Sequence, residues 1–176
     1  MLEQETKFKI PSDFFHPLFF SCDANHLLKI EPDIKETLKS SPFIFDIAFI
    51  SSHTDVLKPW EEQSTFFPLL MELWNDEKKE LNALFKIRDR KKVKARMIKA
   101  LGYYVQFLNW SNGQAVRELK NWQTSISNLN NKPINAVERL EFIIVKPDQY
   151  HSFIQLSQLF EESVKQYYKK LALRKK

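Results

Sequence analysis

The scarcity of glycine restricts what this chain can fold into more than any other feature of its sequence. Among 176 residues, glycine occurs twice, at Gly102 and Gly113. Barrels, sandwiches and dinucleotide-binding folds place glycine at tight turns and close backbone approaches, because glycine tolerates positive φ angles. We therefore predict an all-α protein, a single-domain helical bundle of about six to eight helices with an irregular N-terminal arm.

The predicted single domain, residues 1–176, has three parts. Residues 1–30 are rich in phenylalanine, lack periodicity and are interrupted by prolines, so we expect an irregular arm laid over the bundle, with one helical turn near residues 23–28. Residues 31–130 form the predicted helical body, and residues 132–172 a C-terminal helical hairpin. The hydrophobic share of 43% is sufficient for a buried core.

Helix boundaries in the body are predicted from proline, capping and periodicity signals. Proline in a first helical turn predicts three helix starts, at Pro32, Pro42 and Pro59. The polar pair at 75–76 is expected to cap a further helix. Apolar residues at steps of three and four predict a helix over about residues 91–110, and a weaker pattern predicts another over roughly 114–126.

The C-terminal hairpin consists of two helical patterns separated by Lys146 and Pro147. The first pattern is apolar on more than one face, so we expect that helix at the centre of the bundle. Asn135 is its predicted N-cap, with Glu138 completing a capping box. Asp148 is the predicted cap of the last helix.

The residue order in this hairpin resembles the YpoC-like family. The resemblance is carried by Pro133, Asn135, residues 137–140, Lys146-Pro147, residues 150–152 and Gln155-Leu156, and more loosely by Pro59-Trp60, Leu84-Phe85 and Asn109-Trp110. YpoC-like proteins are small helical bacterial proteins without an established biochemical role. The resemblance therefore implies a helical fold and a bacterial cytoplasmic origin, and it implies no particular activity.

The sequence contains one cysteine, Cys22, so an intrachain disulfide and a cysteine metal cluster are excluded. The first residues lack the apolar run of a secretory signal. The longest apolar segments are far shorter than the roughly 20 residues that span a bilayer. We predict a cytoplasmic protein that does not bind membranes.

Motifs for metal, cofactor or catalytic chemistry are missing from the sequence. The four histidines do not form the paired motif of zinc hydrolases, and no glycine-rich phosphate loop or dinucleotide fingerprint occurs. The Glu-x-x-His motif of di-iron bundles is also lacking. We accordingly predict no catalytic residue, no metal ligand and no cofactor.

Residues 86–99 contain eight lysines or arginines and one aspartate. If this segment is one helix, its charged surface consists of Arg88, Lys92, Arg96 and Lys99, broadened by Lys91 and Lys94. One interpretation is a solvated helix face. The other is contact with a partner or with nucleic acid, which would be non-specific because no base-reading motif accompanies the charge.

Tyr150 and His151, at the start of the last helix, also admit two interpretations. They either hydrogen-bond across the hairpin and fix its angle, or form a partner-contact patch. Our leading hypothesis is a non-catalytic protein-interaction or accessory factor with a protein partner. The alternatives are a non-specific nucleic-acid-binding accessory protein using the basic helix 86–99, and an enzyme with an active site around His151.

Overall fold

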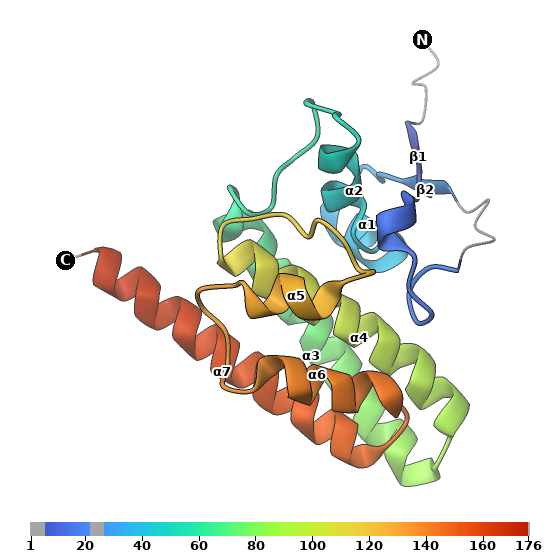
Figure 1. The fold of residues 1–176 in the computed structure, drawn as a ribbon. Coiled ribbons are helices and arrows are strands. Elements are labelled where there is room, and N and C mark those ends of the chain that lie inside the picture. Colours follow the sequence, from blue (N-terminus) through green and yellow to red (C-terminus); the bar gives the residue numbers. More distant parts are fainter. Residues whose placement is uncertain (1–5, 22–26, 176) are drawn as a thin grey trace.

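The computed structural model describes residues 6–21 and 27–175. Within these residues, two short strands and a 3-10 helix precede a series of seven α-helices (Figure 1). The helices are α1 (Ile34–Ser40), α2 (Ile44–Ile50), α3 (Gln63–Ile87), α4 (Arg90–Ser111), α5 (Trp122–Ser127), α6 (Ala136–Val145) and α7 (Tyr150–Arg174). The predicted all-α class and number of helices are confirmed.

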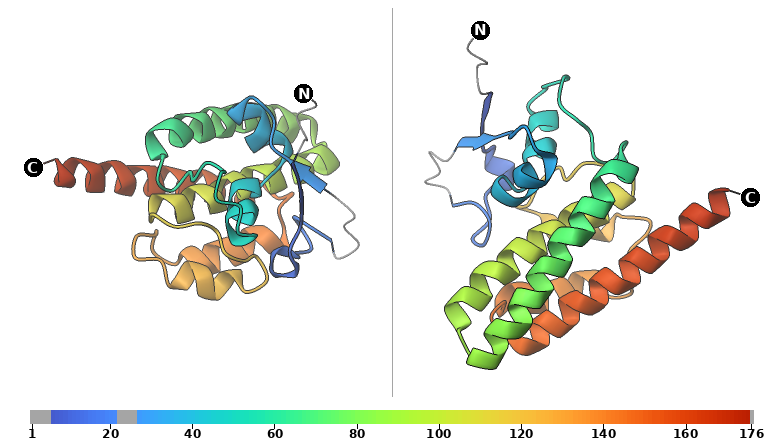
Figure 2. Two further views of the ribbon diagram at one scale, coloured as in Figure 1. Left: turned by 90° about the horizontal axis from the view of Figure 1, so that it is seen from above. Right: turned by 180° about the vertical axis from the view of Figure 1, so that it is seen from behind.

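Helix α4 forms the centre of the molecule. Every residue from 100 to 110 is buried, because this part of α4 is covered on all sides. Helices α3 and α7 both pack against it, and the three long helices lie side by side (Figure 2). The prediction for α4 is correct to within a residue at each end, since its apolar stripe is long and regular.

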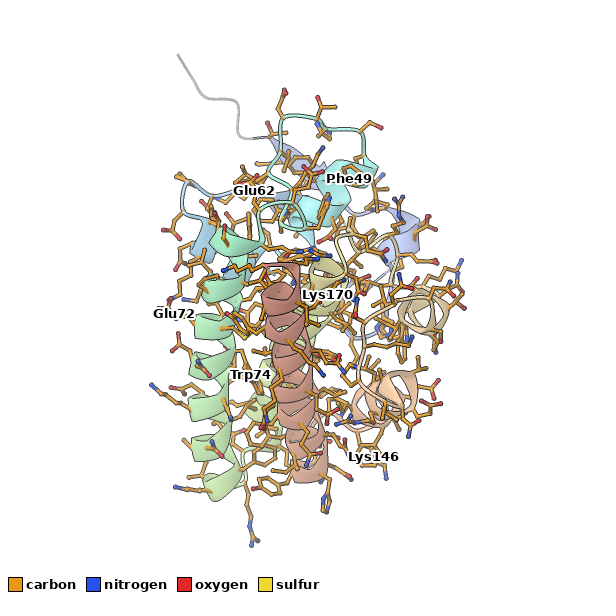
Figure 3. All side chains as sticks on the ribbon, turned by 90° about the vertical axis from the view of Figure 1, so that its left-hand side faces the viewer. Phe49, Glu62, Glu72, Trp74, Lys146 and Lys170 are labelled. Carbon is orange, nitrogen blue, oxygen red and sulfur yellow. The ribbon has the colours of Figure 1, made fainter. Side chains whose placement is uncertain are left out.

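Aromatic rings join α3 to α7. Trp74 of α3 stacks on Phe160 of α7 with ring centroids 4.4 Å apart and planes 11° from parallel. Figure 3 shows Trp74 between the two helices. Helix α3 continues without interruption through residues 75–76, so the predicted helix boundary there is wrong. Packing of the apolar residues on both sides of this polar pair overrides its capping tendency.

Helix α6 lies on the outside of the bundle, and its predicted central position is wrong. Leu140 and Ile143 are buried, whereas Phe142 and Val145 are exposed. This ten-residue helix packs one apolar stripe against α7 and α5, and its remaining apolar side chains face solvent. Helices α6 and α7 pack against each other and are joined by a turn at residues 146–149.

The N-terminal arm is more regular than the sequence indicated. Strand β1 (Lys7–Lys9) pairs antiparallel with β2 (Leu27–Lys29), and a 3-10 helix spans Ser12–Phe14. The helical turn predicted near residues 23–28 lies mostly outside the described residues, and its last two residues belong to β2. The carbonyl of Asp13 accepts hydrogen bonds from the backbone N–H groups of Leu119 and Lys120, at 2.8 and 3.0 Å, which tie the arm to the body.

The proline signals precede the first helical residues by two to four residues. Asp33, not Pro32, provides the N-terminal boundary of α1, because its side chain accepts a hydrogen bond from the N–H of Glu36 at 2.9 Å. Pro42 and Pro59 lie in the turns that lead into α2 and α3. Each proline therefore restricts the backbone of the turn that leads into the helix, and it does not mark the first helical residue.

Two further capping predictions are wrong. Asn135 does precede α6, but it has a φ of 56° and its side chain makes no capping hydrogen bond, so no capping box forms. The last helix starts after Gln149, and Asp148 forms an ion pair instead. The weaker helix predicted over 114–126 is reduced to α5. None of the described helices is long and apolar enough to cross a bilayer.

Candidate binding surface at the α3–α4 turn

The basic segment 86–99 is divided by a sharp turn. Arg88 adopts a left-handed conformation with φ 57° and closes the C-terminus of α3. Asp89 then caps α4 by accepting a hydrogen bond from the N–H of Lys92 at 3.2 Å. The segment therefore does not form the single continuous helix that its charge pattern suggested, and Arg88 lies on a different element from the other predicted contact residues.

Acidic neighbours neutralise three cations of this segment. Arg96 Nη1 lies 3.0 Å from Glu77 Oε2, and the side chain of Glu77 is only 8% exposed. Arg96 also approaches Glu80, at 3.7 Å. This arginine is therefore part of the packing between α3 and α4. Lys92 pairs with Asp89 at 3.7 Å, and Arg90 pairs with Asp148 of the α6–α7 turn at 3.4 Å.

The other five cations of the segment are exposed and form no ion pair with a described residue. They are Lys86, Arg88, Lys91, Lys94 and Lys99. Four of the six predicted contact residues thus remain available for a partner, whereas Lys92 and Arg96 are engaged within the molecule. Acidic residues of α3 and of the α3–α4 turn thus determine which of the predicted contact residues are paired and which remain available.

The α3–α4 turn and the α6–α7 turn lie at the same end of the bundle, which we call the tip. The Arg90–Asp148 pair connects them, and the rings of Phe85 and Tyr150 lie 5.3 Å apart. Lys146, exposed and unpaired among the described residues, adds a further cation, and Figure 3 shows it toward this end. The tip is defined by Lys86, Ile87, Arg88, Lys91, Lys94, Val145, Lys146 and Tyr150.

Large apolar side chains accompany the cations of the tip. Ile87 is 70% exposed and Val145 is 73% exposed. Tyr150 packs the edge of its ring on Phe85 and leaves about half of its surface in solvent. Two of the most exposed large apolar side chains of the described residues thus lie at the same end of the bundle as the unpaired cations.

Ser152, rather than Tyr150 or His151, makes the hydrogen bond across the hairpin turn. Its hydroxyl donates to the carbonyl of Lys146 at 2.6 Å, and the residue is fully buried. His151 is exposed in the first turn of α7. Neither Tyr150 nor His151 hydrogen-bonds to another described residue through its side chain. The sequence indicated the correct cluster but not the residue in it that fixes the turn.

His151 lines neither of two clefts that open on the described part of the surface. The larger, of about 970 Å³, lies between the N-terminal sheet, the start of α1 and residues 52–57, and includes His53 and Asp55. The smaller, of about 570 Å³, runs between α3 and α7. Within the described part of the chain, no three His, Cys, Asp or Glu side chains are grouped to hold a metal ion.

The most perturbed carboxyl group among the described residues lies in the interior and lines neither cleft. Asp46 is completely buried, and burial raises its pKa from 3.8 to about 7 although hydrogen bonds oppose this change. Because no solvent or substrate reaches it, its role is structural. The sequence analysis did not single out this residue. The signal that could have identified it is the position of an aspartate within the apolar run 43–50.

Comparison with known proteins connects the bundle to a family. The family model described as "YpoC-like protein" matches residues 64–175, which span α3 to α7 and exclude the arm, α1 and α2. A protein of Bacillus subtilis (strain 168), described as "Uncharacterized protein YpoC", is 38% identical over 141 residues, covering 80% of this chain and 84% of that protein. No solved structure matches the chain.

Proposed function

The chain belongs to the YpoC-like family, and we propose that it is a non-catalytic interaction protein that binds an acidic protein partner through the tip. The observation that carries this proposal is the set of exposed cations at the tip that have no ion pair with a described residue. An acidic partner would supply the missing counter-charges and would be steered toward this end of the bundle.

The composition of the tip favours a protein partner over a nucleic acid. Ile87 and Val145 expose most of their apolar surface beside the cations, and a phosphate backbone would leave this surface uncovered. A protein partner would bury it, with the cations forming the polar rim of the contact. Asp89 and Asp148 also interrupt the positive surface, which weakens its match to a continuous line of phosphates.

The proposal includes a cytoplasmic setting. The sequence has one cysteine, Cys22, and thus no means of forming an intrachain disulfide, which is typical of proteins in reducing compartments.

Quantitative cross-linking in a lysate of the source cells tests the proposal. The wild type is compared with a variant carrying Arg88→Glu, Lys91→Glu and Lys94→Glu, and with a control carrying Arg117→Glu, Lys120→Glu and Lys169→Glu. All six residues are exposed, and both variants change the net charge equally. We expect a partner lost from the first variant, retained by the control, and acidic when identified. Equal recovery by all three proteins would overturn the proposal.

Nucleic acid is the second candidate, because the same unpaired cations are suited to phosphate contacts. Fluorescence anisotropy with single- and double-stranded probes at several salt concentrations distinguishes the two. Nucleic-acid binding through the tip would weaken with salt, with a log–log slope of about −0.9 per neutralised phosphate of duplex DNA, and would disappear in the tip variant. It would be insensitive to Ile87→Ser, whereas binding of a protein partner would weaken.

A further inference from the structure

Within residues 6–21 and 27–175, one edge of the N-terminal sheet is covered and the other is open. On the outer side of β2, the hydroxyl of Ser41 donates to the carbonyl of Lys29 at 2.9 Å, and the hydroxyl of Thr37 accepts from the N–H of Glu31 at 2.9 Å. On the outer side of β1, no described residue makes a hydrogen bond to the backbone. The sheet lies at the periphery of the molecule (Figure 2).

The register identifies which groups face the open edge. The carbonyl of Lys29 points away from β1, so Lys29 and Lys7, which lie opposite each other, form a non-hydrogen-bonded pair. Hydrogen-bonded and non-hydrogen-bonded pairs alternate along an antiparallel ladder. The N–H and C=O groups of Lys7 and Lys9 therefore point outward from β1, where a further strand would pair with them.

The side chains of β1 specify what kind of strand would fit. Phe8 is 3% exposed and faces the core, whereas Lys7 and Lys9 project from the opposite, solvent face. Neither lysine forms an ion pair with a described residue. Acidic side chains at alternate positions of an added strand would lie beside these two lysines, and each such cross-strand pair is favourable.

The inner face of the sheet borders the larger of the two clefts. Phe8 lines the cleft of about 970 Å³, together with apolar residues that include Ile30, Val56 and Leu57. The strand residues that alternate with the acidic ones point toward this side of the sheet. Short apolar side chains at these positions would lie next to Phe8.

We propose that the outer edge of β1 binds an extended, acidic segment of a partner protein as a third strand of the sheet. Backbone hydrogen bonds to Lys7 and Lys9 supply affinity, and the two lysine side chains select for acidic residues. The same lysines oppose pairing with β1 of a second copy, because like charges would lie side by side. This site is separate from the tip and does not depend on it.

Fluorescence anisotropy with a labelled, acetylated heptapeptide of alternating glutamate and valine tests this proposal. We expect the wild type to bind it and the double variant Lys7→Glu, Lys9→Glu to bind it at least about tenfold more weakly, since two favourable charge pairs become two repulsive ones. A peptide with lysine in place of glutamate should show the opposite preference. N-methylation of the amides that would donate to β1 should abolish binding of the acidic peptide.

The double variant Lys91→Glu, Lys94→Glu is the control for general electrostatic attraction, because it changes the net charge equally at the tip. It should bind the acidic peptide as the wild type does. The proposal is overturned if this control loses binding to the same extent, if N-methylation has no effect, or if the wild type does not bind at millimolar peptide. Both β1 lysines are exposed, and an unchanged circular dichroism spectrum verifies the fold of their variant.

Discussion

Trp110 donates a hydrogen bond of 2.9 Å from its indole Nε1 to Oδ1 of Asp46, 64 positions earlier in the chain. The same oxygen accepts the backbone N–H of Val116 at 2.7 Å. One buried carboxyl oxygen thus joins α2 to the end of α4 and to the segment that follows it. The other oxygen, Oδ2, is buried without a hydrogen-bond partner among the described residues.

Stability should depend on pH through Asp46. Its pKa rises from 3.8 to about 7 on burial, so the folded protein binds this proton more tightly than the unfolded chain does. The resulting contribution is complete below about pH 4 and is lost as the pH rises through 7. Its size is about 4 kcal/mol at roughly 1.36 kcal/mol per pH unit.

Urea unfolding of the wild type and Asp46→Asn between pH 4 and 8 measures this contribution. The substitution retains an oxygen acceptor but removes the titration. We expect the difference in unfolding free energy, wild type minus variant, to fall as the pH increases. Parallel pH profiles of the two proteins would contradict the assignment.

Ser152→Ala should destabilise the protein by about 1 kcal/mol or more, because it leaves the carbonyl of Lys146 without the hydroxyl that closes the hairpin turn. His151→Ala, at the adjacent exposed position, is the matched control and should leave the midpoint of thermal unfolding unchanged. If the histidine variant is the less stable of the two, the structural assignment within this cluster is wrong.

Arg139 should contribute more than the surface ion pairs do. It contacts both carboxylate oxygens of Glu162 at 2.9 Å and the side chain of Gln155 at 3.0 Å, and it is 18% exposed. We expect Arg139→Met to cost about 1 kcal/mol, because a bidentate, partly buried pair is lost. Lys165→Met, which removes the exposed pair with Glu161, should have no measurable effect in the same denaturant titration.

Alanine at the two glycines should change stability in opposite directions. A methyl group at Gly102 would lie 3.7 Å from Phe19 and 3.8 Å from Phe43, which is ordinary contact, and alanine improves a helix interior by about 0.5–1 kcal/mol. Gly113 has a φ of 76°, where alanine costs roughly 1–2 kcal/mol. Calorimetric melting temperatures should therefore rise for Gly102→Ala and fall for Gly113→Ala.

The sequence was most informative where a helix carries its own periodic stripe, as in α4. It was misleading at residues 114–121, where a helical pattern is present but no helix forms. The N–H of Val116 binds Asp46 and those of Leu119 and Lys120 bind Asp13, so long-range partners replace the hydrogen bonds of a helix. Neither partner is identifiable from local sequence.

The candidate surface was located by sequence but not resolved into its parts. A run of cations identifies a charged segment, but it does not show which cations form ion pairs. Arg96 is paired, unlike Lys91 and Lys94, because Glu77 faces it across the α3–α4 contact. The open edge of β1 escaped notice for a similar reason. Three residues are too few for a strand pattern, and the covered edge of β2 becomes evident only from the hydroxyl groups of α1 and the residue after it.

The attachment of Asp13 to Leu119 and Lys120 also sets an order for synthesis. The arm leaves the ribosome before its anchoring N–H groups are made, because these lie more than a hundred residues later in the chain, on the order of ten seconds at ordinary translation rates. Until then Phe14 and Phe20, both buried in the finished protein, have no complete site to enter. The nascent chain should therefore present these rings to chaperones until the residues up to 120 have emerged.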